Sequence, residues 1–199
     1  DSGEGKKKFQ AVNNVITSLL FILGALVVLF RNVIFIVLAD DYQSASIIIP
    51  FLLFLPILGT IKSTTGAGIV LSRKTYYLIP IYITSTIANI IGNWILVPNY
   101  GAMGASIATG ISFIITFWLF TIVSRKLWRI KLSFELMIIN TIAFLFFAFI
   151  SLLQNVYFEI LSVIVIILIN YKSIIYLQKK IPVKDIMNYF KNSLSIAKR

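Results

Sequence analysis

The 199-residue chain contains neither cysteine nor histidine. Without cysteine it can form no disulfide bond, no thiol nucleophile and no thiolate metal site. Without histidine it lacks the commonest metal ligand and the side chain that most readily exchanges a proton near neutral pH. These two absences exclude most enzyme chemistry, so we expect no catalytic residue, no metal site and no cofactor.

Acidic residues are scarce as well. The chain has seven Asp and Glu against eighteen Lys and Arg, which gives a formal net charge of +11. No acid lies near the centre of an apolar run, since Glu135 and Glu159 lie at the ends of such runs. Carriers driven by protons or sodium usually hold a carboxylate within the membrane, so this chain supplies no obvious coupling site. No nucleic-acid-binding motif accompanies the positive charge, and we expect no nucleic-acid partner.

Apolar residues, by contrast, make up 59% of the chain, and the mean hydropathy is +0.94. A soluble domain of this size cannot bury so much apolar surface. A hydrocarbon layer about 30 Å thick needs roughly 20 apolar residues per helical crossing, and runs of this length can span it only as helices. We therefore predict an all-α integral membrane protein. Its six transmembrane helices are expected at Ala11–Phe30, Ala45–Leu71, Tyr76–Val97, Met103–Val123, Leu136–Leu153 and Val156–Leu177.

The basic residues predict how these runs are threaded. Passing them back and forth through a membrane places seventeen of the eighteen Lys and Arg on one side and leaves only Arg31 on the other. Short turns at residues 98–101 and 154–155 connect runs on the Arg31 side. Basic loops stay in the cytosol under the positive-inside rule, so both ends of this segment are expected to be cytoplasmic. The same charges favour contact with anionic membrane lipids.

We expect two parts along the chain. Residues 1–177 form a six-helix transmembrane lobe, and residues 178–199 form a basic cytoplasmic tail. In that tail apolar residues recur at three- and four-residue spacing after Pro182, which predicts an amphipathic helix on the membrane surface; a frayed tail is the alternative. Within the lobe, residues 33–38 are interpreted as the outer end of a long or bent first helix, and Pro50 and Pro56 predict bends in the second.

Polar residues inside the runs are few. Ser85, Asn89 and Asn93 share one helical face at intervals of four, and such a face turns away from lipid. It predicts either hydrogen bonds to a neighbouring helix or part of the lining of a polar cavity. The fourth run begins with small residues from Gly101 onward, whose spacing predicts close helix packing. The last two runs are expected to support the bundle, with their Phe-rich faces in contact with lipid.

Two cations stand out from the others. Lys62 lies within the second run, beside polar residues 63–65 and Gly66, where a lipid-facing charge costs about 3 kcal/mol at mid-bilayer. We expect either a wetted surface around it or a side chain that reaches back to the inner head groups. Arg31, at the opposite rim, is expected either to pair with Asp40 or Asp41 or to contact an anionic substrate.

Residues 89–112 read NIIGNWILVPNYGAMGASIATGIS. This stretch resembles the signature of the polysaccharide-exporting flippases. Its features follow in order: an Asn, an apolar run, Pro98, a short polar turn and then Gly-Ala-x-Gly-Ala-Ser. These flippases form the O-antigen and teichoic-acid type (Wzx-like) branch of the multidrug/oligosaccharidyl-lipid/polysaccharide exporter superfamily. Residues 38–58, LADDYQSASIIIPFLLFLPIL, and the glycine-bearing helix that ends in Arg73 and Lys74 also look like this family.

The resemblance covers nearly the whole chain but only about half of a family member. It implies the C-terminal lobe of a two-lobed exporter in the bacterial cytoplasmic membrane, with a six-helix N-terminal lobe as its partner. A central cavity would open alternately to each side. The implied substrate is a lipid-diphosphate-linked glycan bound by cavity cations, for which the corresponding positions here are Lys62 and Arg31. The face formed by Ser85, Asn89 and Asn93 is expected to line the same cavity.

Two alternatives remain open. A multidrug efflux lobe of the same superfamily would need an acidic residue for a cationic drug, and none lies within the runs. A non-transporting membrane scaffold fragment would pack against partners without enclosing a cavity.

Overall fold

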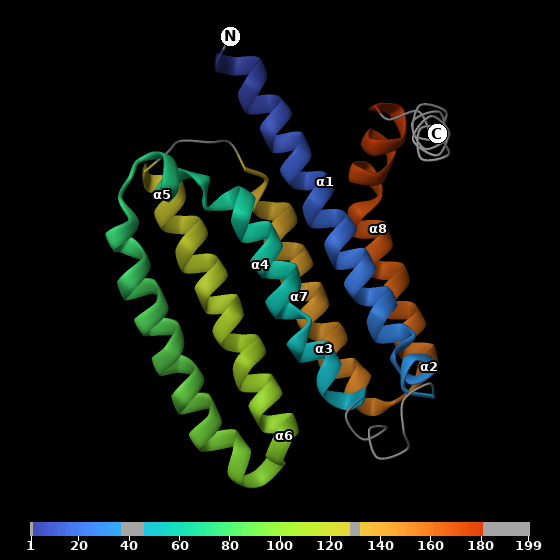
Figure 1. Ribbon diagram of the computed structural model, residues 1–199. Coiled ribbons are helices and arrows are strands. Elements are labelled where there is room, and N and C mark those ends of the chain that lie inside the picture. Colours follow the sequence, from blue (N-terminus) through green and yellow to red (C-terminus); the bar gives the residue numbers. More distant parts are fainter. Residues whose placement is uncertain (1, 37–45, 128–131, 181–199) are drawn as a thin grey trace, which may run out of the picture.

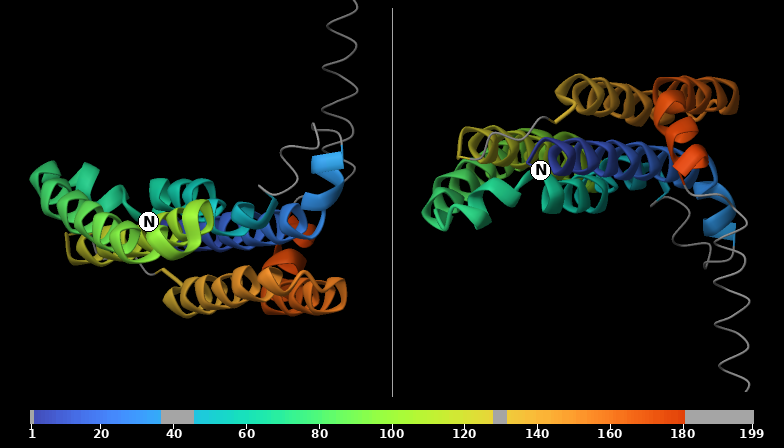
Figure 2. Two further views of the ribbon diagram at one scale, coloured as in Figure 1. Left: turned by 90° about the horizontal axis from the view of Figure 1, so that it is seen from below. Right: turned by 90° about the horizontal axis from the view of Figure 1, so that it is seen from above.

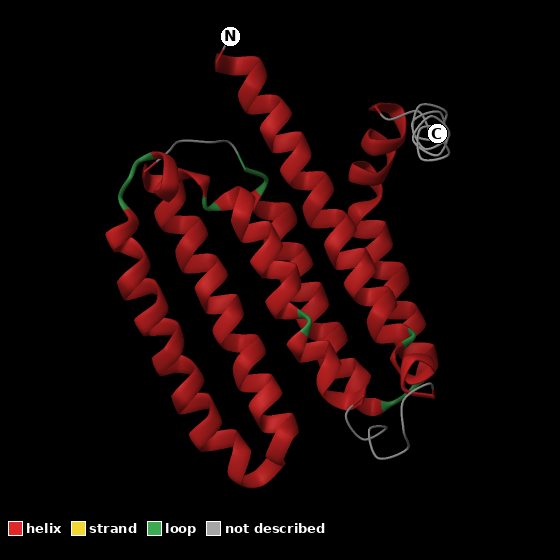
Figure 3. Ribbon diagram, viewed as in Figure 1, coloured by secondary structure: helices red, strands yellow, loops and turns green. Residues whose placement is uncertain are grey.

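Every element that the computed structural model describes is a helix (Figures 1 and 3). The described backbone comprises residues 2–36, 46–127 and 132–180. The long helices are α1 (Ser2–Leu29), α4 (Phe54–Thr65), α6 (Leu78–Leu127), α7 (Phe134–Ile150) and α8 (Val156–Lys180). Short helical segments connect them: α2 (Arg31–Ile36), α3 (Ile49–Leu52), α5 (Ala67–Leu71), η2 (Thr75–Tyr77) and η3 (Ser151–Leu153). The predicted all-α class is confirmed for these residues.

Five described stretches are long and apolar enough to cross a membrane: Phe9–Leu29, Ser46–Thr65, Thr75–Leu127, Phe134–Leu153 and Val156–Tyr176. Their outer faces carry large apolar side chains, such as Trp94 at 80% exposure and Leu168 at 66%. Apolar surface on this scale is compatible with lipid rather than with water. The chain therefore has the character of a multi-pass membrane protein, while the count of six crossings stays a prediction.

α6 is a helical hairpin rather than one straight rod. Gly101 interrupts it with φ of 54° and ψ of −130°, a conformation that residues with a Cβ atom rarely adopt. The chain then runs back along itself, so that Gly92 lies against Ala108 and Gly104 lies against the backbone of Leu96. Figure 1 shows the two legs side by side with the turn at one end of the bundle. The predicted turn and the predicted close packing of small residues are both confirmed.

The second apolar run is broken twice. α3 ends and α4 begins around Leu53, and Pro56 in the first turn of α4 has no N–H to bond the Leu52 carbonyl. The helix is therefore interrupted at Leu53, close to Pro56, where a bend is predicted. Pro50 lies in the first turn of α3, where proline is tolerated without a kink. A second break, at Gly66, separates α4 from α5.

The first run is bent as well. α1 ends at Leu29, and α2 begins at Arg31 after a turn at Phe30. Of the two alternatives, a long or a bent first helix, the structure therefore shows an interrupted helix as far as Ile36. Asp40 and Asp41 lie outside the described residues, and so does the amphipathic helix expected in the C-terminal tail.

α1 occupies the centre of the bundle. Seen end-on, it lies between α3 and α4 on one side and α7 and α8 on the other (Figure 2), and it contacts all four. At this centre the rings of Phe21 and Phe144 meet edge-on, with centroids 5.7 Å apart. Phe144 and Phe147 are buried, whereas Phe146 and Phe149 are exposed. The expectation that the Phe-rich face of α7 contacts lipid is wrong for Phe144 and Phe147, because residues three apart share a helical face and this face points into the core.

The two ends of the bundle differ in charge. Arg73 and Lys74 follow α5, and Arg125 and Lys126 lie in the last turn of α6. Figure 1 shows α5, the N-terminal end of α1 and the C-terminal end of α8 together at this end, which we call the basic end. Arg31 lies at the opposite end, beside the α7–α8 turn. The one-sided charge distribution is confirmed for the described residues, and its assignment to the cytosol stays a prediction.

Candidate functional site

Lys62 lies in the last turn of α4, where the helix dipole favours a cation. Its Nζ donates a hydrogen bond of 3.3 Å to the Tyr82 hydroxyl and lies 5.2 Å from the centre of the Phe120 ring. Tyr82 belongs to the first leg of α6 and Phe120 to the second. Among the described side chains no carboxylate pairs with Lys62. The ammonium is thus held by a hydroxyl and two aromatic faces, which leave its charge without a counter-charge.

Glycine allows α4 and α5 to approach α6 closely enough for these contacts. A Cβ atom on Gly66 would overlap the Phe120 ring, and one on Gly68 would overlap the Ser124 backbone. The Gly68 N–H also donates a hydrogen bond of 2.9 Å to the Ser124 hydroxyl. Lys62 therefore reaches both legs of α6 because small residues follow it in the sequence.

Some of the hydroxyl side chains near Lys62 are buried inside the bundle, and others are exposed. Thr65 is buried, with its hydroxyl 3.0 Å from that of Thr121 on α6. Thr65 and Gly66 therefore pack inside the bundle and are not part of an exposed polar surface around Lys62. The exposed hydroxyls of α4 belong instead to Thr60 and Ser63, which bond carbonyls of their own helix.

The polar face predicted in the third run points at the second leg of α6. Ser85 donates a hydrogen bond of 2.9 Å to the Ser112 carbonyl and accepts one from the Thr116 hydroxyl. The Asn89 amide lies 3.4 Å from the Ser112 hydroxyl, and Asn93 donates to the Asn89 oxygen at 3.0 Å. The predicted interhelical hydrogen bonds are present, and they hold the hairpin closed. A direct contact of these residues with substrate stays a prediction.

Arg31 is buried at the end opposite the basic end. Its Nη2 donates to the Glu159 carboxylate at 2.7 Å and to the Ser151 carbonyl at 3.1 Å, and its Nη1 donates to the Val28 carbonyl at 3.0 Å. Glu159 lies in the first turn of α8, where the helix dipole favours an acid. Sequence reasoning missed Glu159 as the partner because it lies 128 residues away. Contact between Arg31 and a substrate would require this ion pair to open.

α1 carries four polar residues that sequence reasoning left out: Asn13, Asn14, Thr17 and Ser18. They form two pairs at spacing i, i+4, the same signal that identified the face on α6. The Asn13 amide donates to the Thr64 hydroxyl on α4 at 2.6 Å. The side-chain oxygens of all four are buried and accept no hydrogen bond from any described residue. A buried polar atom without a partner costs about 1–3 kcal/mol, so α1 holds unused hydrogen-bonding capacity.

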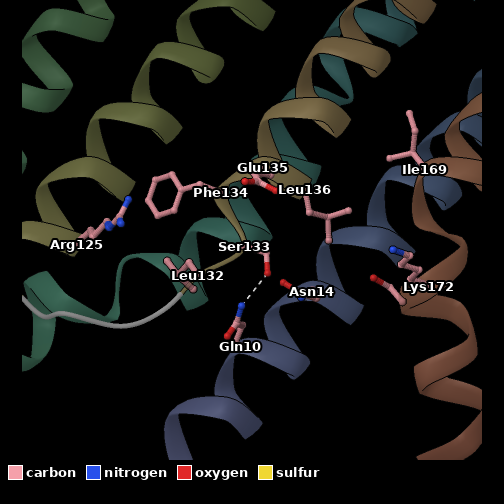
Figure 4. Close-up of a pocket in the computed structure, with 11 residues that line it drawn as sticks. Gln10, Asn14, Arg125, Leu132, Ser133, Phe134, Glu135, Leu136, Ile169 and Lys172 are labelled. Carbon is pink, nitrogen blue, oxygen red and sulfur yellow. Dashed lines mark hydrogen bonds between the residues drawn. The ribbon is translucent and has the colours of Figure 1, made fainter.

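A polar pocket opens at the basic end, where α1, α7, α8 and the end of α6 meet (Figure 4). Its volume is about 570 Å³. Its main polar lining residues are Gln10, Asn14, Arg125, Ser133, Glu135 and Lys172. The Gln10 amide donates a hydrogen bond of 2.9 Å to the Ser133 hydroxyl. Sequence reasoning treated Arg125 and Lys172 only as markers of topology, because the four segments that build the pocket are far apart along the chain.

The described side chains include no group of three or more acids that could hold a metal ion. What the geometry offers is binding by cations and neutral hydrogen-bonding groups, at Lys62 and in the basic-end pocket. Comparisons with protein-family models, with curated proteins and with solved structures found no match.

Proposed function

We propose that this chain forms one lobe of an exporter that carries lipid-diphosphate-linked glycans across the bacterial cytoplasmic membrane by alternating access. The observation that carries the proposal is Lys62, a half-buried residue whose ammonium has no acidic partner among the described residues. It lies within Ser46–Thr65, a stretch long and apolar enough to cross a membrane. A diphosphate supplies the counter-charge that this cation lacks. The resemblance of residues 89–112 to polysaccharide flippases supports the same substrate class.

A charged, sugar-bearing head group cannot pass through hydrocarbon without a polar path. The Tyr82 hydroxyl lies beside Lys62, and α4 also exposes the hydroxyls of Thr60 and Ser63. Hydroxyl groups can both donate and accept hydrogen bonds, which suits the hydroxyls of a sugar. In this proposal Lys62 binds the diphosphate and the neutral groups bind the glycan, while the lipid tail stays in the membrane.

The proposal requires six crossings, and the hairpin in α6 supports that number. The legs at residues 78–100 and 102–127 measure about 35 and 39 Å at 1.5 Å per residue. Each leg is therefore long enough to cross a hydrocarbon layer of about 30 Å. With six crossings, both ends of the segment lie on the side of the basic end, as the positive-inside rule requires.

Alternating access requires a second six-helix lobe and a flexible element. We propose that the two lobes enclose the cavity and rock against each other. The break between α3 and α4 is the proposed flexible point, because Pro56 leaves the Leu52 carbonyl without its helical hydrogen bond.

Substitution of Lys62 in the intact exporter tests this proposal. The protein is reconstituted into vesicles with a fluorescent lipid-diphosphate oligosaccharide, and the rate at which the head group reaches the other leaflet is measured. We expect Lys62→Ala to lower the initial rate by roughly 10- to 100-fold, the loss that one charge-assisted hydrogen bond produces. Lys62→Arg should retain most of the rate because it keeps the charge.

Lys126→Ala is the matched control. Lys126 is an exposed cation in the last turn of α6, and its replacement should leave the rate unchanged. An unchanged rate for Lys62→Ala at equal protein abundance would remove Lys62 from the mechanism. Extrusion of cationic drugs without glycan transport would favour the multidrug alternative, and the absence of any transport would favour a scaffold.

A further inference from the structure

We propose that the basic-end pocket binds the head group of a phospholipid that carries a primary ammonium, of the phosphoethanolamine type. Lys172 meets the phosphate, while Glu135 meets the ammonium. The site is separate from Lys62, which does not line the pocket and instead contacts Tyr82 and Phe120 on the two legs of α6. Asn13 of α1 bonds Thr64 on α4, whereas the next residue, Asn14, lines the pocket. The inference does not depend on the proposed transport function.

The pocket lies at the level of lipid head groups. Its polar residues all fall within five residues of an end of a candidate membrane span. Glu135, for example, is the second residue of Phe134–Leu153, and Lys172 lies four residues before the end of Val156–Tyr176. The ends of apolar spans meet the polar head groups of the bilayer. The volume of about 570 Å³ is typical of small-molecule sites, and lipid is the small molecule most abundant at this depth.

The charges in the pocket match a zwitterion. Lys172 on α8 and Glu135 on α7 are both exposed and line the same pocket. They do not form an ion pair with each other or with any other described residue. The third charge, Arg125, lies 4.4 Å from the centre of the Phe134 ring, on the side of the pocket away from Lys172 (Figure 4). A ligand with one charge would leave Lys172 or Glu135 unmatched. A head group with both phosphate and ammonium matches the two.

Hydrogen-bonding capacity selects among zwitterionic head groups. The carboxylate of Glu135, which is exposed in the pocket, only accepts hydrogen bonds. A primary ammonium offers three N–H donors, whereas the trimethylammonium of choline offers none. Gln10 and Ser133 already bond each other and so fix the adjoining wall. The pocket therefore favours ethanolamine over choline.

Native mass spectrometry of the full chain in detergent tests the proposal by titration with phosphatidylethanolamine or phosphatidylcholine of identical acyl chains. We expect the ethanolamine lipid to bind about tenfold more tightly, the ratio that one charge-assisted hydrogen bond supplies. Glu135→Gln should reduce this preference to near unity. Lys172→Gln should weaken both lipids about tenfold, since both contain a phosphate. Lys126→Gln, at the same end but outside the pocket lining, should bind like the wild type.

Both pocket residues are exposed, so their variants should fold, and an unchanged helical circular dichroism spectrum checks this. Equal wild-type affinity for the two lipids, or an unchanged preference in Glu135→Gln, would overturn the proposal. Tighter binding of phosphatidylglycerol than of phosphatidylethanolamine would also overturn it, because that lipid has no ammonium. Displacement of bound lipid by free phosphoethanolamine at about 1 mM would assign the pocket to a soluble phosphate ester instead.

Discussion

Removing one partner of the Arg31–Glu159 ion pair should destabilise the protein strongly. The two side chains are 3% and 4% exposed, and their charged atoms lie 2.7 Å apart. The guanidinium also bonds the carbonyls of Val28 and Ser151, so it connects the end of α1 to the junction of α7 and α8. Arg31→Met leaves the Glu159 carboxylate buried without its cation, and Glu159→Met leaves Arg31 without its anion.

The expected magnitude follows from this burial. Breaking a buried ion pair from one side costs about 3–5 kcal/mol, whereas replacing both partners with apolar residues is often neutral. For a chain of this size each kcal/mol shifts the melting temperature by about 2–4 °C. Each single variant should therefore melt roughly 6–20 °C below the wild type. The double variant Arg31→Met/Glu159→Met should melt within a few degrees of the wild type.

Thermal unfolding in detergent, followed by far-ultraviolet circular dichroism, measures all four proteins under one condition. Lys126→Met is the control for loss of an exposed cation, and it should cost less than about 1 kcal/mol. If the single variants cost no more than this control, the pair is not buried in the folded protein. If the double variant loses as much as the two single variants together, the two charges do not interact.

Two further perturbations test the helix contacts. Gly101→Ala should destabilise the protein by about 1–3 kcal/mol because of its φ of 54°, whereas Gly59→Ala, inside α4 with open space around the added Cβ, should be neutral or stabilising by up to about 1 kcal/mol. Thermal unfolding of the two variants side by side measures this, and equal effects would contradict a constrained turn at Gly101. Asn140 and Asn170, both buried, exchange hydrogen bonds of 3.0 and 2.6 Å between α7 and α8. A double-mutant cycle with leucine should give a coupling energy of about 0.6–1.7 kcal/mol, and a value near zero would show that the pair does not stabilise the protein.

The helices and turns were predictable because their signals are local. Runs of apolar residues predicted the stretches that are long and apolar enough to cross a membrane, and the sequence around Pro98 and Gly101 predicted the reversal in α6. Small residues predicted the close approach of the two legs, since a Cβ atom on Gly104 would overlap the backbone of Leu96. Each of these inferences needs only residues near one another in the chain.

The contacts between distant segments were less predictable. Arg31 was expected to pair with a nearby aspartate, and its described partner is Glu159, at the start of the last helix. The hydrophobic pattern of α7 did not show which phenylalanine rings face the core, because lipid and core are both apolar. The buried polar residues of α1 were overlooked, although they repeat at the same spacing of four that identified the polar face on α6.

The sequence by itself determined the all-helical class, the membrane character and the one-sided placement of the basic residues in the described chain. These properties follow from composition and order along the chain, since the bilayer selects helices by length and apolarity. Only the tertiary structure decided which groups satisfy the buried charges and polar atoms. It brought Lys62 against two aromatic rings, Arg31 against Glu159, and α1, α6, α7 and α8 around one polar pocket. In an apolar bundle these partners are set by helix packing in three dimensions, which spacing along one helix does not specify.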